Sequence, residues 1–79
     1  MEIKRLEGII EAILFTMGES VEVERIANAI EHDVPTTRKI IRNMMDRYQE
    51  EDRGIRIIEL EDSFQMCTKP EVYEYLIRI

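Results

Sequence analysis

The apolar residues between Pro35 and Tyr48 recur at the spacing of an α-helix, and this stretch constrains what the rest of the chain can do. Residues three, four and seven positions apart share one side of a helix. The side chains that fall on this side are Thr37, Ile40, Ile41, Met44 and Tyr48. Asp33 can cap the first turn, and Arg53-Gly54 offers a left-handed stop. The pattern predicts a helix whose buried side must be covered by other elements.

Two more helices are predicted before this one, over residues 3–17 and 22–30. The inner side of the first is formed by Ile3, Leu6, Ile10, Ile13, Leu14 and Met17. A second apolar side of the same helix is formed by Gly8, Ile9, Ala12 and Phe15. It has two interpretations: this helix is central and covered by its own chain, or the small residues let a second chain approach closely.

The second and third helices are separated only by residues 31–34, which predicts a helix-turn-helix. After Gly54 the pattern becomes extended. Ile55–Leu60 and Phe64–Thr68 read as two strands joined by the turn Glu61-Asp62-Ser63, which is a β-hairpin. The apolar residues of the first strand do not alternate cleanly, so we expect either a bulge or a strand covered on both faces.

A fourth helix is predicted from Thr68-Lys69-Pro70-Glu71, which matches a capping box. Its expected inner stripe consists of Val72, Tyr75, Leu76 and Ile79. Tyr73 and Ile77 remain outside that stripe.

This order of elements predicts an α+β fold, a winged helix-turn-helix with three helices, a hairpin wing and a C-terminal helix. With 79 residues the chain is expected to be a single domain, residues 1–79, too small to enclose a deep active site. Because no capping residue follows the fourth helix, we expect a longer protein to continue beyond residue 79.

Catalysis is not expected from this inventory of side chains. His32 and Cys67 are the only histidine and the only cysteine, and no glycine-rich phosphate loop is present. We therefore predict no catalytic, cofactor-binding or metal-binding residues. Charges interrupt every short apolar run near Met1, so no secretory signal or membrane span is expected and a cytoplasmic location fits.

DNA binding is the usual role of this fold, and Arg38, Lys39 and Arg42 lie on the exposed side of the predicted recognition helix. The net charge of −6 and the acidic wing, with Glu59 and Glu61-Asp62, argue against that role. Each carboxylate near a phosphate costs on the order of 0.5–1 kcal/mol in water. These residues favour protein–protein interaction. The alternatives are a winged-helix DNA-binding transcriptional regulator that uses the three basic residues, and a fragment whose apolar surface belongs against a missing half.

Three segments together resemble a known family. These are Glu11–Phe15 followed by Gly18-Glu19, Arg53–Ile55 entering the hairpin, and Phe64–Glu71. They are similar to the N-terminal domain of the bacterial segregation and condensation protein B, ScpB, and the resemblance runs along essentially the whole chain. Ser20 and Glu22 depart from the family's usual proline and serine at these positions, so the start of the second helix is expected to be weakly capped.

The resemblance implies a non-catalytic subunit of the bacterial SMC condensin-like complex, which acts in chromosome condensation and segregation. It implies a homodimer that binds the kleisin ScpA and, through it, SMC, at the nucleoid in the cytoplasm. The acidic charge pattern, independently of the resemblance, predicts no direct nucleic-acid binding by this domain, and no membrane contact is expected. Proteins of this family carry two winged-helix domains, so the resemblance implies that residues 1–79 are the N-terminal half of a longer, two-domain protein. The N-terminal domain is associated in this family mainly with dimerisation. The candidate dimer interface is Gly8, Ile9, Ala12, Phe15, Tyr73 and Ile77.

Overall fold

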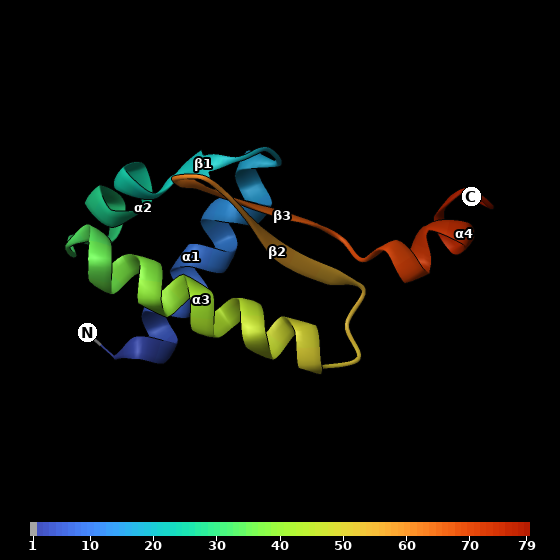
Figure 1. The fold of residues 1–79 in the computed structure, drawn as a ribbon, viewed down its shortest axis with the longest axis horizontal. Helices are drawn as coiled ribbons and strands as arrows, with labels where there is room; N and C mark the ends of the chain where they lie inside the picture. The colour runs from blue at the N-terminus through green and yellow to red at the C-terminus, as the bar shows by residue number, and fades with distance from the viewer. Residues whose placement is uncertain (1) are drawn as a thin grey trace.

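The computed structural model describes residues 2–79 and contains four helices, a short 3-10 turn and three strands (Figure 1). The helices are α1 (Ile3–Met17), α2 (Val23–Ile30), α3 (Val34–Glu50) and α4 (Tyr73–Leu76). The strands are β1 (Val21–Glu22), β2 (Ile55–Leu60) and β3 (Ser63–Thr68), and the 3-10 turn η1 (Pro70–Val72) precedes α4. The winged helix-turn-helix predicted from the sequence is therefore confirmed.

The core lies where α1, α2 and α3 meet the inner face of the sheet. Leu6, Ile10 and Leu14 of α1 are buried in it, as is the whole predicted stripe of α3. Phe64 of β3 is fully buried among these residues. Burial of such side chains stabilises a small domain by about 1.5–3 kcal/mol each relative to exposure. The helical phase predicted for α3 is confirmed.

The structure confirms the prediction for the start of α3 but not the prediction for its end. At its start, the Asp33 carboxylate accepts a hydrogen bond of 2.9 Å from the Thr36 amide, as predicted, and Pro35 lies in the first turn. At its end the prediction was wrong. Glu51 ends the helix in an extended conformation, and Gly54 does not adopt the left-handed conformation expected of a stop. The loop is held instead by Lys69, whose ammonium donates to the Glu51 carbonyl at 2.8 Å.

The bounds predicted for α1 are confirmed, but its inner side is narrower than expected. Ile13 and Met17 are half-buried, and Ile3 is 60% exposed because the helix extends past the core at its N-terminal end. As predicted, Glu22 does not cap α2 with its side chain. The amide of Val23 donates instead to the Asp62 carbonyl at 2.7 Å, so the wing turn supplies an acceptor for the start of this helix.

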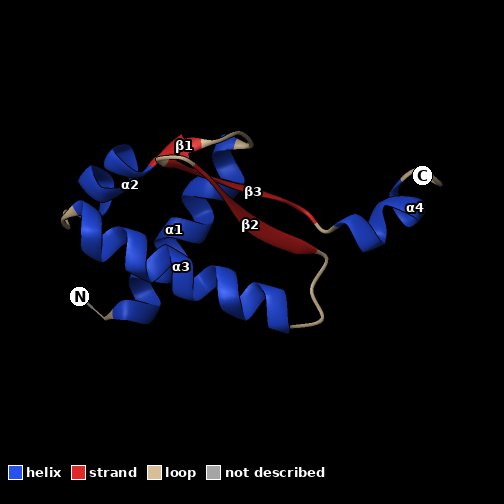
Figure 2. Cartoon of the chain, in the orientation of Figure 1, coloured by secondary structure: helices blue, strands red, loops and turns tan. Residues whose placement is uncertain are grey.

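The sheet has three antiparallel strands in the order β1-β3-β2, one more than the hairpin expected from the sequence (Figure 2). Val21 pairs with Phe64, which ties the connection between α1 and α2 to the wing. β2 and β3 pair without interruption from Ile55↔Thr68 to Leu60↔Ser63, so no bulge is present within this ladder. Ile57 faces the core, whereas Ile58 and Leu60 lie on the opposite, partly exposed face.

The C-terminal segment differs more from its predicted structure than any other element does. Residues Pro70–Ile79, here called the arm, form η1, the four-residue α4 and a final turn, and they project from one end of the domain (Figure 1). The molecule is accordingly elongated, with extents of 41 × 21 × 20 Å. The expected inner stripe of this helix was wrong, because Val72 is only half-buried and Tyr75, Leu76 and Ile79 are exposed. The expected capping box was also wrong, since no side chain caps η1.

Candidate interaction surfaces

The basic residues of α3 lie against carboxylates of the wing, so they are partly neutralised within the chain. Arg42 makes two hydrogen bonds to Glu59, at 3.0 Å from Nε and 2.9 Å from Nη2. Arg38 donates to Glu59 at 3.1 Å and to Asp62 at 3.3 Å. Hydrogen bonds from Arg42 are the main cause of a lowered pKa for Glu59, which therefore stays ionised at neutral pH. We call Arg38, Arg42, Glu59 and Asp62 the wing clasp.

The wing clasp leaves little free positive charge on the predicted recognition helix. Lys39 is exposed and, within residues 2–79, makes no ion pair. Of the three candidate DNA contacts, two are thus engaged with carboxylates, and a phosphate would have to displace them. Breaking these ion pairs would cost free energy in addition to the repulsion from the net negative charge. The arrangement therefore disfavours the DNA-binding alternative.

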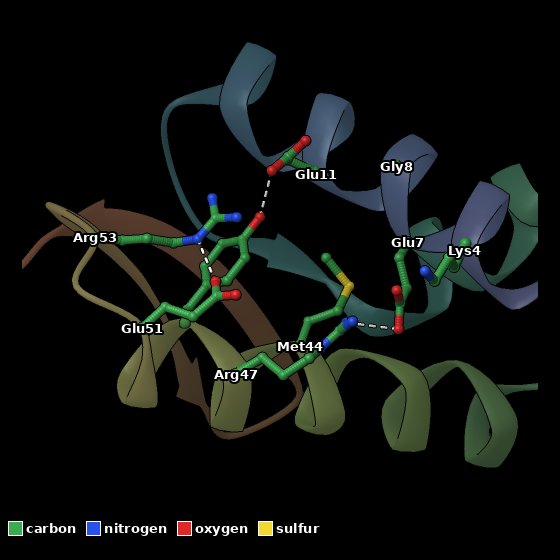
Figure 3. A pocket seen from close by; sticks show the side chains of 9 residues that line it. Lys4, Glu7, Gly8, Glu11, Met44, Arg47, Glu51 and Arg53 are labelled. Carbon is green, nitrogen blue, oxygen red and sulfur yellow. Dashed lines mark hydrogen bonds and ion pairs between the residues drawn. The ribbon is translucent and has the colours of Figure 1, made fainter.

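A second cluster of charges joins α1 to α3 around a shallow hollow of about 230 Å³ (Figure 3). Arg47 pairs with Glu7 at 2.6 Å, and the Tyr48 hydroxyl donates to the Glu11 carboxylate. Burial, with the Glu11 hydrogen bond, raises the pKa of Tyr48 to about 12. The guanidinium of Arg53 lies over the Tyr48 ring, 4.8 Å from its centroid. A neutral phenol and paired carboxylates hold two helices together and provide neither a nucleophile nor a free general base.

The second apolar side of α1 is open to solvent in this chain. Phe15 is 78% exposed, and Gly8 and Ala12 are also exposed. A Cβ atom added at Gly8 would meet nothing within 4 Å, so no close contact among the described residues requires a glycine there. Ile9 differs from the other three, because it is half-buried and packs against the core. Within residues 2–79, no other element covers this side as the central-helix interpretation required.

Beside this surface lies a small hollow of about 240 Å³ between α1 and the sheet. It is lined by Glu11, Ala12, Phe15, Ile55 and Met66. The two other candidate interface residues, Tyr73 and Ile77, lie on the arm and are 48% and 84% exposed. The structure therefore leaves five of the six candidate interface residues accessible, on two separate elements. The hollow itself was missed by sequence reasoning, because it forms between α1 residues and strand residues that are at least 40 positions apart in the sequence.

Neither a metal-ligand cluster nor a membrane-spanning helix occurs in the part of the chain that the structure describes. No group of three or more histidine, cysteine, aspartate or glutamate side chains among residues 2–79 could hold a metal ion. No helix in that range is long and apolar enough to cross a membrane.

Comparison with known proteins places the chain in a family. Residues 8–79 match the family model of the segregation and condensation complex subunit ScpB. The chain belongs to the ScpB family. Two curated relatives named segregation and condensation protein B support this: one from Lachnoclostridium phytofermentans is 70% identical over all 79 residues, and one from Agathobacter rectalis is 55% identical over 74 residues, 92% of this chain. The chain spans 42% and 40% of the length of these ScpB proteins.

Two solved ScpB structures share this fold. A crystal structure of a dimer of the ScpB N-terminal domain, complexed with an ScpA peptide, has a TM-score of 0.90 and 30% identity. The superposition covers 96% of this chain and 95% of that one. The crystal structure of ScpB from Mycobacterium tuberculosis has a TM-score of 0.92 at 22% identity, over 99% of this chain and 49% of that one, and shows the fold alone. The ScpB resemblance predicted from the sequence is confirmed.

Proposed function

We propose that this chain is the N-terminal domain of a non-catalytic ScpB subunit of the SMC condensin-like complex, and that its main role is homodimerisation. One observation carries the proposal: the ScpB domain that superposes on almost the entire chain was crystallised as a dimer with an ScpA peptide. In this proposal the chain forms a homodimer, binds the kleisin ScpA and reaches SMC through it. The complex then acts in chromosome condensation and segregation in the cytoplasm, at the nucleoid.

The proposed dimer interface consists of the exposed side of α1 with outward residues of the arm, namely Gly8, Ile9, Ala12, Phe15, Tyr73 and Ile77. Exposure supports this choice for all but Ile9, which packs partly against its own core. Small residues beside Phe15 allow close approach, and burial of apolar area at roughly 25 cal/mol per Å² offsets the cost of association. The sheet's partly exposed outer face carries no such run of small residues.

The dimer is tested by sedimentation of Ala12→Arg beside a matched control, Ala29→Arg. Ala29 is an exposed alanine on α2, outside the proposed interface. The parent chain and Ala29→Arg are expected to sediment as dimers at tens of micromolar. Ala12→Arg is expected to sediment as a monomer, because it places a long charged side chain in the contact. A monomeric parent, or equal masses for both variants, would contradict the proposal.

ScpA binding is tested separately with a labelled peptide from the kleisin's ScpB-binding region. The parent chain is expected to bind it saturably, and fluorescence anisotropy measures the affinity. If no binding occurs at hundreds of micromolar, the kleisin contact proposed for this domain is wrong, whatever the sedimentation result.

A further inference from the structure

The arm has the composition of a segment that packs against protein, although it packs against almost nothing in its own chain. Its only charged residues after Lys69, which are Glu71, Glu74 and Arg78, recur at helical spacing and so share one side. Arg78 and Glu74 face each other on that side at 3.5 Å. The remaining side chains after Pro70 are all apolar or aromatic, and Ile77 and Ile79 are among the most exposed large hydrophobic residues. A short helix of this kind needs a tertiary partner to be stable in water.

The root of the arm is anchored, so its direction is set by the domain. Lys69 is only 5% exposed. Its ammonium donates to the Glu51 carbonyl and its backbone amide to the Gly54 carbonyl, both at 2.8 Å. Pro70 follows directly, with φ restricted by its ring. These contacts send the chain away from the core, and folding back onto its own α1 would require a reversal immediately after Lys69.

The apolar hollow between α1 and the sheet lies at the same end of the domain as this root. Ile55, which lines the hollow, pairs with Thr68, the residue just before Lys69. The hollow is bordered by Ala12 and Phe15 of α1 and by Met66 of β3. A second copy related by a two-fold axis beside the root would therefore present its hollow to the first arm and its own arm to the first hollow.

We propose that the ScpB dimer is an arm-exchanged dimer, in which the arm of each protomer docks in the hollow between α1 and the sheet of the other. This inference rests on the proposed dimer and specifies its geometry. It joins the two separated parts of the proposed interface, since Tyr73 and Ile77 of one protomer meet Ala12 and Phe15 of its partner. Exchange of an element in this manner is a low-cost route to a closed, symmetric pair.

The test uses two differently tagged chains, both carrying Cys67→Ala to remove the native thiol. One chain also carries Ala12→Cys and the other Ile77→Cys. After the chains are mixed and allowed to exchange, mild oxidation is expected to produce a disulfide between the two tags. The matched control replaces Ala12→Cys with Ala29→Cys and is expected to give at least tenfold less cross-linked product.

Three outcomes would overturn the arm exchange. The first is no more cross-link than in the control. The second is that one chain carrying both Ala12→Cys and Ile77→Cys oxidises to a monomer with an internal disulfide, which would show that the arm folds back. The third is a monomeric mixture before oxidation, which would also reject the proposed dimer. A dimeric mixture without cross-link would reject the exchange alone.

A second measurement does not depend on cysteine chemistry. Ile77→Asp is expected to weaken the dimer at least tenfold in dissociation constant while leaving the circular dichroism unchanged, because Ile77 is 84% exposed within its own chain. The matched control is Leu60→Asp, at an exposed leucine on the wing. An unchanged dissociation constant for Ile77→Asp would overturn the proposal.

Discussion

Individual buried side chains contribute to the stability of this small core in different ways. Met44 lies in the middle of the buried stripe of α3 and is 2% exposed. Thr37 in the same stripe is fully buried, and its hydroxyl finds no hydrogen-bond partner among the described residues. Lys69 is buried as well, but its ammonium is bound to the Glu51 carbonyl. A buried group of this kind stabilises the fold only where its polar atoms are paired, as those of Lys69 are.

Met44→Ala is expected to lower the free energy of unfolding by about 2–5 kcal/mol, because it opens a cavity in a close-packed core. For a domain of this size that is a large part of the total stability. Urea denaturation followed by circular dichroism measures the loss. Arg42→Ala serves as the control on the opposite side of α3, and it is expected to lower the free energy of unfolding far less than Met44→Ala, since exposed ion pairs contribute little. If Arg42→Ala cost more than Met44→Ala, the phase assigned to α3 would be wrong.

The wing and α3 act as a coupled pair of elements. The wing places Glu59 between Arg38 and Arg42, and the Asp62 carbonyl receives the first amide of α2. The recognition helix is thus held by ion pairs on the side where a DNA-binding winged helix would contact phosphate. The same contacts align the wing with the helix-turn-helix.

Acidification is expected to weaken the wing clasp. The folded-state pKa of Glu59 lies below its ordinary value of 4.5, mainly because Arg42 donates hydrogen bonds to the carboxylate. A lowered pKa contributes stability that is present above the ordinary value and is lost as the pH falls through the folded value. We expect the parent to be more stable than Glu59→Gln at pH 7, with the difference shrinking below about pH 4.5. Urea titrations of both chains from pH 7 to pH 3 measure it, and a difference that is constant across this range would contradict the assignment.

Duplex DNA is expected to bind this chain no better than it binds a generic acidic protein. The net charge is −6, and the guanidinium groups of Arg38 and Arg42 are already paired. Electrophoretic mobility shifts at low salt check this. A salt-dependent shift at low micromolar protein that Arg42→Ala abolishes would restore the transcriptional-regulator alternative.

Residues 2–79 form a compact body and a projecting arm, and these two parts differ in how much of their apolar surface is buried. Most large apolar residues of the body are buried, although Ile3, Phe15 and Leu60 are exposed, whereas most of the large hydrophobic side chains of the arm lie in solvent. In the proposed dimer, the arm of one protomer would cover the exposed side of α1 of its partner. The elongated shape, 41 Å in its longest extent, comes from the projecting arm.

The thermal midpoint of the parent chain is expected to rise with protein concentration, because association stabilises the folded state by mass action. Calorimetry from about 5 to 500 µM measures this rise. Ala12→Arg is expected to unfold at a midpoint that does not depend on concentration. A parent whose midpoint stayed constant across that range would not be dimerising on folding.

Local patterns in the sequence determined most of the elements. The repeat of apolar residues placed α1 at its observed bounds and gave the correct phase for α3, since a helical side is defined by neighbours three and four positions apart. The Asp33 cap and the hairpin turn are equally local. The resemblance to ScpB rested on other local segments, Glu11–Phe15 with Gly18-Glu19, Arg53–Ile55 and Phe64–Glu71, each of them short and contiguous.

Only the tertiary structure decided how distant residues meet. The pairing of Val21 with Phe64, the wing clasp between α3 and β2, and the capture of the α3 end by Lys69 join residues far apart in the chain. The arm shows the same limit: its spacing predicted a helix, but spacing carries no information on the direction in which that helix leaves the domain. That direction depends on the contacts of Lys69 with the loop after α3, and these exist only once the sheet and the helices have packed together.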